Sequence, residues 1–352
     1  MSIDLCYNFL TRRPMEAAMD DRPTPSTDAD VLVAGMLFFD AVFADLPHGP
    51  VLGQEHWTPH FAWTPGGIAN FAIAAARLGA STDVAAAVGD DELSGLCRAA
   101  LAREGIGTAL LARIPGWSIP VSACLGYDGD RAIVTGGTES PVALPDILPA
   151  TGGRVAALHV DESTAEWVRT SADRGQRVFA DVGWDASGAW DPAVLDAIDG
   201  AHAFTPNDRE AMAYTRTDDP VRAARLLAER VPLSVVTCGA DGVVAVDSAS
   251  GDEVVVPGVR VRAVDATGAG DVFCAALAVA SLEDRPLRER VDLAALVAAI
   301  TVSRPGGAST APRRDELLPW LAANPTAAQP HRYDFLPTFL QAATAGPPDP
   351  RP

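Results

Sequence analysis

Short apolar runs alternate with segments of helical periodicity over most of the chain. The predicted strands are Val31–Gly35, Asp83–Val88, Ala156–Val160, Val178–Ala180, Ala203–Thr205 and Ser234–Thr237. The predicted helices are Asn70–Leu78, Leu93–Glu104, Ser163–Arg174, Asp208–Tyr214 and Val221–Arg230. Strands and helices that take turns along a chain form βαβ units. The pattern therefore predicts the α/β class, with a mainly parallel sheet covered by helices on both faces.

Two stretches interrupt this alternation, about 41–62 and 107–137. In the second, Ile119–Tyr127 alternates apolar and polar residues, Asp128-Gly129 is a turn signal, and Arg131–Thr135 follows as another β-run. We interpret both stretches as insertions that form a small β lid over the main domain.

Both ends of the chain lack a sustained period. Residues 1–28 are polar and contain prolines, and residues 323–352 are rich in Pro and Ala, so we expect a flexible tail at each end of a single domain spanning 29–322. Within the second tail, the aromatic segment His331–Leu340 could dock as a short helix. The last ten residues are expected to be disordered.

Charge and composition limit the partners. The chain has 46 acidic and 27 basic residues, a net charge of −19, so we expect neither nucleic acid nor an anionic membrane as a partner. The longest apolar stretch, Val272–Leu282, is shorter than the roughly 20 residues of a membrane-spanning helix. The N-terminus has no secretory pattern, and the five cysteines show no C-x-x-C pairing. We therefore expect a cytoplasmic protein.

The chain contains no lysine. A P-loop of the form G-x-x-x-x-G-K-[ST], the strand lysine of protein kinases and a Schiff-base lysine are therefore all excluded. Any phosphoryl transfer must proceed without a lysine.

The segment Val264–Asp271, with the sequence VDATGAGD, is followed directly by an apolar helix. Its small residues leave backbone N–H groups accessible, and the start of a helix favours a bound anion. A carboxylate in that first turn, Asp271, can accept a proton from an attacking hydroxyl. Taken alone, Asp271 could equally well serve only to complement the helix dipole.

Three further motifs accompany this segment. Gly66-Gly67 enters a helix of small residues that begins near Asn70, which suits either close helix packing or a bound polyol. Asn207 and Glu210 have the spacing of a capping box. A buried strand ends in a T-x-G-x-x-G turn, whose defined positions are Thr237, Gly239 and Gly242.

These four motifs, in this order, resemble the ribokinase-like carbohydrate kinases, also called the phosphofructokinase B-type family. The similarity covers about 30–318, and the Asp265–Asp271 run, similar to D-[ST]-x-[AG]-[AG]-G-D, is its most specific part. The resemblance implies an ATP- and Mg²⁺-dependent kinase that acts on a hydroxymethyl group of a small sugar. Asp271 would be the base, and the N–H groups of Gly268, Ala269 and Gly270 would form the anion hole.

The resemblance also assigns the remaining roles. Substrate contacts would come from Asp40, Gly66, Gly67, Asn70, Glu162 and Asp265. Nucleotide contacts would come from Asn207, Thr237, Gly239 and Gly242, with Glu210 holding Mg²⁺ through water. Asp265 and the segment Ser303–Thr310 would form a loop for a monovalent cation, K⁺.

Three departures from the family pattern bear on these roles. Ala266 replaces the usual Thr or Ser, so one hydroxyl near the cation loop is missing. The spacing from Gly66 to Asn70 is one residue shorter than in many members. The stretch Asp181–Asp185 replaces Asp-x-Asn-x-Arg, which weakens the case for fructose-like and ketodeoxygluconate-like substrates.

Two other functions stay open at this point. A nucleoside kinase would keep the mechanism and change the acceptor, whereas a non-catalytic sugar- or nucleotide-binding regulator would bind without forming ADP. A nicotinamide oxidoreductase is disfavoured because no predicted strand runs into G-x-G-x-x-G. Exposed lid strands leave room for a homodimer through the lid.

Overall fold

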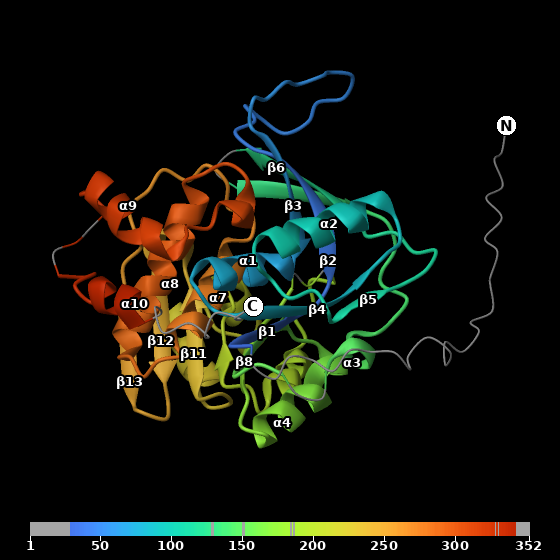
Figure 1. The fold of residues 1–352 in the computed structure, drawn as a ribbon. Helices are drawn as coiled ribbons and strands as arrows, with labels where there is room; N and C mark the ends of the chain where they lie inside the picture. The colour runs from blue at the N-terminus through green and yellow to red at the C-terminus, as the bar shows by residue number, and fades with distance from the viewer. Residues whose placement is uncertain are drawn as a thin grey trace, which may run out of the picture.

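The computed structural model describes residues 29–127, 130–149, 152–183, 185, 187–327, 329 and 331–342. Within them, nine strands form one sheet in the order β13-β12-β11-β10-β9-β8-β1-β4-β5 (Figure 1). The strands are β1 (Val31–Ala34), β4 (Thr82–Val88), β5 (Leu111–Arg113), β8 (Val155–His159), β9 (Arg177–Asp181), β10 (Ala203–Phe204), β11 (Leu233–Thr237), β12 (Val243–Asp247) and β13 (Asp252–Val256). Pairing is parallel from β5 to β11, and only β11–β12 and β12–β13 are antiparallel.

Helices cover both faces of this sheet, as the sequence pattern predicts. One face packs against α1 (Ala69–Arg77), α2 (Glu92–Arg103), α7 (Ala269–Ala280) and α8 (Leu287–Val302). The other packs against α4 (Ala165–Asp173), α5 (Asp208–Thr215), α6 (Pro220–Leu227) and the 3₁₀ helix η2 (Pro192–Ile198), with α3 (Leu144–Ile147) beside β4. The remaining short helices are η1 (Glu162–Thr164), η3 (Gly239–Asp241), η4 (Gly307–Thr310), η5 (Arg314–Glu316), α9 (Leu317–Ala323) and α10 (Leu336–Ala342).

The period of two along each strand explains this burial on both faces. In β1, Val31 and Val33 belong to the core beneath α1 and α7, whereas Leu32 and Ala34 belong to the core beneath α4 and α6. Both sets are apolar, so the central strand has no polar face. Continuous apolar runs are therefore what the buried parallel strands require.

A second, four-stranded sheet forms the predicted lid. Its order is β3-β2-β6-β7, from β2 (Leu37–Phe43), β3 (Phe61–Gly67), β6 (Val121–Tyr127) and β7 (Asp130–Gly136). The loop between β2 and β3 projects from the top of the molecule (Figure 1). This loop makes up most of the first predicted insertion, 41–62. Within the second predicted insertion, 107–137, β5 does not belong to the lid but pairs with β4 of the main sheet.

The chain leaves the main sheet directly after its first strand. The strand predicted at Val31–Gly35 is β1, and a break at Gly35 and Met36 separates it from β2. Gly35 has a φ of +159°, and a Cβ there would lie 3.1 Å from the side chain of Ile68. The break lets the chain leave the main sheet and enter the lid, so Asp40 lies in the lid sheet.

The C-terminal segment docks on α8, and α10 confirms the helix expected in the aromatic segment. Arg332 Nε donates to Asp292 Oδ1 at 2.6 Å, and both side chains are buried. The guanidinium of Arg314 lies 3.8 Å from the ring centroid of Phe339. Residues 1–28 of the first predicted tail, residues 343–352 of the second (323–352) and the turn at Asp128-Gly129 lie outside the described residues.

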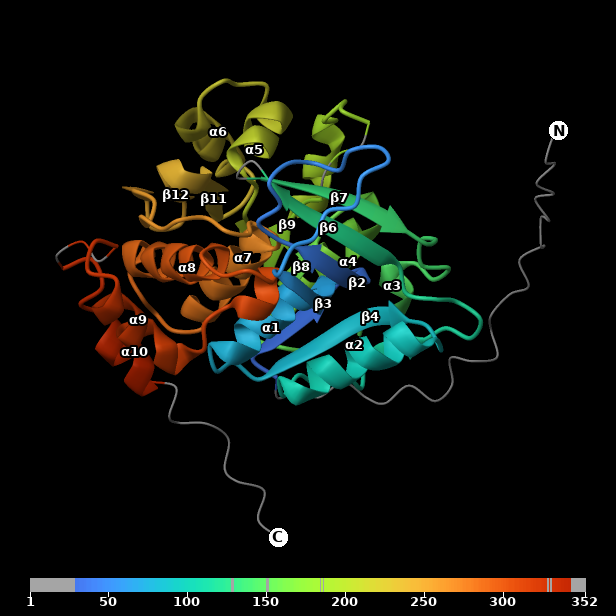
Figure 2. The same cartoon turned by 90° about the horizontal axis from the view of Figure 1, so that it is seen from above.

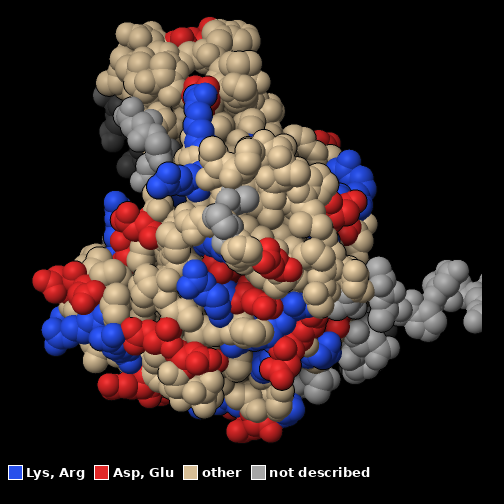
Figure 3. Space-filling model, turned by 90° about the vertical axis from the view of Figure 1, so that its left-hand side faces the viewer, with Lys and Arg blue, Asp and Glu red and all other residues tan. Residues whose placement is uncertain are grey.

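Seen from above, α7 and α8 run beside α1 between the lid and the C-terminal helices (Figure 2). Across the described chain, no helix is both long and apolar enough to cross a bilayer. Figure 3 shows acidic and basic side chains interspersed over the body of one face, whereas the projection above it carries few charges.

Candidate active site

Polar side chains gather where the parallel strands end. His159 closes β8, Asp181 closes β9 and Thr237 closes β11, all at the carboxyl edge of the sheet. The first turn of α7 starts at the same edge, because Asp271 contacts His159 there. In open α/β sheets this edge is where ligands bind.

The start of α7 exposes backbone donors. Gly268 is the N-cap residue, with φ +71°, in the left-handed region that favours glycine. The Ala269 amide donates to Ala266 O at 3.2 Å, whereas the amides of Gly268 and Gly270 have no acceptor among the described residues. The predicted anion hole therefore offers two uncommitted N–H groups at a helix N-terminus.

Asp271 lies in that first turn and is held on both oxygens. Asn70 Nδ2 donates to Oδ2 at 2.8 Å, and His159 Nε2 lies 3.1 Å from Oδ1. Asn70 is buried in α1 and packs against Gly268, where an added Cβ would lie 2.8 Å from Asn70 Nδ2. The structure thus brings together two of the predicted site residues from segments 200 positions apart.

His159 was not among the predicted site residues. Its ring meets the ring of Phe71 edge to face, with 5.3 Å between centroids. Burial alone would lower the pKa of His159, but the hydrogen bond and charge of Asp271 outweigh burial and raise this pKa to about 9. The imidazole is therefore charged at neutral pH.

Asp181, noted from the sequence only as a departure from the family pattern, lies beside His159 and Asp271. His159, Asp181 and Asp271 each present a side-chain atom within 4.8 Å of the others. Burial raises the pKa of Asp181 well above its usual value, while the nearby His159 acts in the opposite direction. Burial also raises the pKa of Glu210, whose carboxylate interacts with both His159 and Asp271.

Asp40 reaches the same cluster from the lid. It is buried, and burial together with the charge of Asp271 raises its pKa to about 7. Gly66 lies on the neighbouring strand β3, opposite Phe38, and any Cβ there would overlap the Asp40 carboxylate. Gly67 has φ +59° and would bring a Cβ to 2.5 Å from Met36 O. Gly66 therefore leaves room for the Asp40 carboxylate, and Gly67 lets β3 end close to Met36 and Phe38.

Asp265 fastens the 264–271 segment to the 303–310 segment. Its Oδ1 accepts the Thr267 amide at 2.9 Å, and its Oδ2 accepts the amides of Gly306 and Gly307 at 3.1 and 2.8 Å. The carboxylate is buried. The two halves of the expected cation loop are therefore adjacent.

The nucleotide motifs are also adjacent to one another. Asn207 and Glu210 form the predicted capping box of α5, with both reciprocal bonds at 3.0 Å. The Thr237 amide donates to Pro206 O at 3.1 Å, which sets the end of β11 beside the start of α5. Gly239 and Gly242 follow in the turn after β11, both with positive φ.

Glu162 follows the end of β8 by three residues. It is exposed in the first turn of η1, and none of the described hydrogen bonds joins it to Asp271, Asn70 or Asp40. His159, three residues earlier, is the residue of this segment that reaches the cluster. A polar residue at the end of a predicted buried strand was the available signal for both His159 and Asp181.

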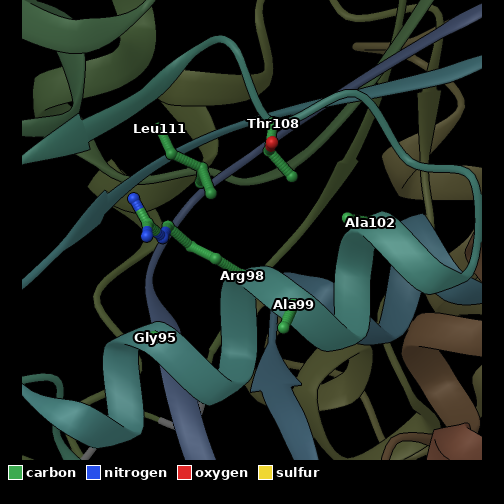
Figure 4. Close-up of a pocket in the computed structure, with 6 residues that line it drawn as sticks. All are labelled: Gly95, Arg98, Ala99, Ala102, Thr108 and Leu111. Carbon is green, nitrogen blue, oxygen red and sulfur yellow. The ribbon is translucent and has the colours of Figure 1, made fainter.

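A hollow of about 320 Å³ between α2 and the chain leading into β5 is a poor candidate for the site (Figure 4). Its lining consists of Gly95, Arg98, Ala99, Ala102, Thr108 and Leu111. It contains no carboxylate or imidazole that could act as a base. The polar groups that could act as a base lie instead beside the start of α7.

Comparison with known sequences gives one family over most of the chain. The sequence profile described as "pfkB family carbohydrate kinase" matches residues 29–314. The ribokinase of Haemophilus influenzae is 26% identical over 280 residues, which cover 72% of this chain and 85% of that protein. The ribokinase of Bacillus subtilis is 29% identical over 279 residues, 76% of this chain and 91% of that protein.

Solved structures share the fold. Thermotoga maritima ribokinase superposes with a TM-score of 0.68 at 24% identity, over 84% of this chain and 99% of that one. Arabidopsis thaliana ribokinase, complexed with ribose and ATP, superposes with a TM-score of 0.68 at 21% identity, over 83% of this chain and 98% of that one.

Proposed function

The chain belongs to the pfkB family of carbohydrate kinases, and on that premise we propose that it phosphorylates a hydroxymethyl group of a small sugar with Asp271 as the general base. The family and the ribokinase and fructokinase relatives indicate an ATP-dependent carbohydrate kinase. The observation that carries the specific proposal is the position of Asp271, in the first turn of α7 beside the uncommitted amides of Gly268 and Gly270.

In the proposed reaction, the acceptor hydroxyl loses its proton to the Asp271 carboxylate. The acceptor oxygen then forms a bond to the γ-phosphorus of ATP, the bond from that phosphorus to the β–γ bridging oxygen breaks, and ADP leaves. The amides of Gly268 and Gly270 and the N-terminus of α7 stabilise the charge on the phosphoryl group in transit. The Ala269 amide, the third group of the predicted anion hole, donates to Ala266 O at 3.2 Å and would have to exchange that bond to take part. This arrangement needs no lysine, consistent with the composition.

We assign the nucleotide to the edge formed by Asn207, Thr237, Gly239 and Gly242, and Mg²⁺ to Glu210 through water. A structure assigned as ribokinase II from Escherichia coli, with a TM-score of 0.71 at 18% identity, is in complex with ATP and Mg²⁺. The Glu210 carboxylate suits a divalent cation because it is buried and the described hydrogen bonds use only its Oε2. When bound, the metal would neutralise charge on the nucleotide phosphates.

On the acceptor side, we propose contacts from Asp40, Gly66, Gly67, Asn70, Glu162 and Asp265. A nucleoside remains the second candidate acceptor, because a nucleoside kinase from Methanocaldococcus jannaschii superposes with a TM-score of 0.67 at 20% identity. A panel of ribose, fructose, adenosine and inosine, scored by ADP release, separates the two classes. The same panel with and without K⁺ tests the cation loop at Asp265 and Ser303–Thr310.

Asp271→Asn tests the central assignment. The variant should lose at least about 10²-fold in kcat with the best acceptor of the panel, because an amide cannot take up the proton. Asp284→Asn, an exposed aspartate in the turn after the same helix, is the matched control and should keep full turnover. Near-normal turnover of Asp271→Asn would refute the base assignment. Acceptor binding in calorimetry without ADP formation by the wild type would instead support a regulator.

We also propose a homodimer through the lid and a reducing compartment. The lid exposes Leu52, Trp57, Phe61 and Val134. The cysteines Cys97, Cys124, Cys238 and Cys274 are free thiols, which is consistent with a cytoplasmic location.

A further inference from the structure

The candidate base lies among several carboxylates. Asp40, Asp181 and Glu210 interact electrostatically with Asp271, and Asp265 interacts with Asp40. Burial and the nearby charge of Asp271 raise the pKa of Asp40, Asp181 and Glu210. The carboxylates of this group therefore repel one another when they are all ionised. The phosphates of ATP would add negative charge to the same place.

His159 is the basic side chain that contacts the candidate base. Its Nε2 forms an ion pair with Asp271 Oδ1 at 3.1 Å. The imidazole contacts Asp271 of α7 and packs edge to face on Phe71 of α1, and the charges of Asp181 at the end of β9 and Glu210 in α5 also act on it. A third of its surface reaches solvent.

The contact between His159 and Asp271 also restricts the orientation of the Asp271 carboxylate. His159 fixes Oδ1 and Asn70 fixes Oδ2, so the carboxylate cannot rotate without losing a hydrogen bond. Each oxygen keeps a second lone pair for the acceptor hydroxyl. A charge-assisted bond is roughly twice as strong as a neutral one, so the imidazolium holds this orientation better than a neutral donor would.

We propose that His159, as an imidazolium donating from Nε2 to Asp271 Oδ1, is a positioning residue that orients the base and offsets the repulsion among the surrounding carboxylates. This inference rests on the proposed function of Asp271. His159, the last residue of β8, belongs to none of the sequence motifs, so this role could not be assigned from them.

The first test needs no acceptor. The chain has six histidines, so two-dimensional NMR of the imidazole Cε1–Hε1 groups is tractable, and His159→Gln identifies the His159 signal by its disappearance. In the wild type this signal should titrate near the pKa of about 9, and in Asp271→Asn its midpoint should fall by more than one pH unit. A wild-type midpoint at or below the ordinary value of about 6.5, or no change in Asp271→Asn, would overturn the proposal.

The second test measures kcat, KM and their pH dependence with the best acceptor of the panel. His159→Gln, which keeps a neutral donor, should lower kcat about 10-fold, and His159→Phe, which keeps only the ring shape, about 10²-fold, because the base is misplaced. KM values for ATP and acceptor should change less than about threefold, since the ground-state contacts remain. Wild-type kcat should fall as pH rises through about 9, where the imidazolium loses its proton, and this alkaline limb should vanish in both variants.

His202→Gln is the matched control. His202 contacts Phe179 at the other edge of the sheet, and burial lowers its pKa to about 4, so it is neutral at working pH. Its replacement should leave kcat and the pH profile unchanged. If Asp271→Asn abolishes turnover while the His159 variants keep wild-type kcat and pH profile, the positioning role is wrong and the base stands. If Asp271→Asn retains turnover, the proposed function itself fails.

Discussion

At the scale of single residues, Gly268 links the backbone of α7 to the candidate base. Its φ of +71° disfavours a side chain, and its Cα lies against Asn70, the partner of Asp271. Gly268→Ala should therefore lower the free energy of unfolding by about 1–3 kcal/mol, because the backbone is strained and Asn70 is displaced. Urea unfolding measures the first effect, and a loss of kcat measures the second.

The matched control is Gly95→Ala in α2. A Cβ at Gly95 meets nothing within 4 Å, and the residue lies inside a helix. Alanine should stabilise the protein there by about 0.5–1 kcal/mol. If Gly268→Ala and Gly95→Ala change the free energy of unfolding in the same direction, the positive φ of Gly268 is not what makes glycine necessary there.

Only part of the site could be predicted from single residues. Asp271, Asn70, Asp40 and Gly66 follow from motifs with fixed local spacing, and the structure brings them together. His159 and Asp181 belong to no such motif. Their importance depends on β8 and β9 lying side by side beneath α7, and the sequence does not state which strands are neighbours.

At the scale of elements, Arg77 ties α1 to the loop that holds Asp265. Its guanidinium donates to Ser309 O at 2.6 Å, to Ala311 O at 2.8 Å and to both oxygens of Glu104. The Arg77 side chain is only 15% exposed. Arg77→Met keeps the aliphatic stem and should cost about 2–4 kcal/mol of unfolding free energy, because it leaves buried acceptors without partners.

Arg225→Met serves as the control for that variant. Arg225 pairs with Glu253 in similar geometry, at 2.7 Å, but its side chain is 61% exposed. Exposed pairs contribute little, so the change should cost less than about 1 kcal/mol. Equal losses in chemical denaturation for the two variants would show that burial is not what makes the Arg77 contacts matter.

The order of strands and helices was largely predictable, because apolar period and helix caps are local properties. The bounds of β4, β8, α1 and α2 differ from the predicted ones by about one residue. The predicted strand Val31–Gly35 ends at the observed break, but no strand was predicted at Leu37–Phe43, where β2 begins. Only the pairing of β2 with β3 and β6 reveals that the chain changes sheets there.

At the scale of the whole molecule, the acid cluster predicts how stability varies with pH. The folded-state pKa values of Asp40 and His159 are raised, to about 7 and about 9, so the folded protein binds more protons than the unfolded chain between about pH 6.5 and 9. The melting temperature of the protein without ligands should therefore fall as pH rises across this range. Differential scanning calorimetry at pH 6.5, 7.5 and 9 measures the slope.

Other groups change the steepness of this slope. His202, whose pKa is lowered to about 4 in the folded state, still carries part of a proton in the unfolded chain between about pH 6.5 and 7.5, so it opposes the slope there. Burial raises the pKa of Asp181 and of the cysteine thiols, which steepens it, and Glu104, whose pKa is lowered, is ionised in both states. Asp40→Asn should flatten the slope near pH 7, and His159→Gln should flatten it towards pH 9. A melting temperature that rises with pH in the wild type would contradict the raised pKa values.

The proposed dimer can be tested through the lid surface. Trp57 is 86% exposed, and the projection that carries it has few charges (Figure 3). Trp57→Asp should convert a dimer to a monomer in sedimentation experiments, because large exposed apolar areas mark interfaces. Leu96→Asp, on the exposed face of α2, should leave the sedimentation unchanged. A monomeric wild type would rule the interface out.

Asp40 is carried by the lid sheet, whereas Asn70 and Asp271 belong to the body, and this division has an effect on acceptor affinity. If the lid sheet opens away from the body, only molecules with the lid closed present all three groups at once. If closed molecules made up about one tenth of the unliganded population, the apparent Kd for the acceptor would be about tenfold weaker than that of the closed form. A variant that favours closure would bind the acceptor more tightly without gaining a single contact to it.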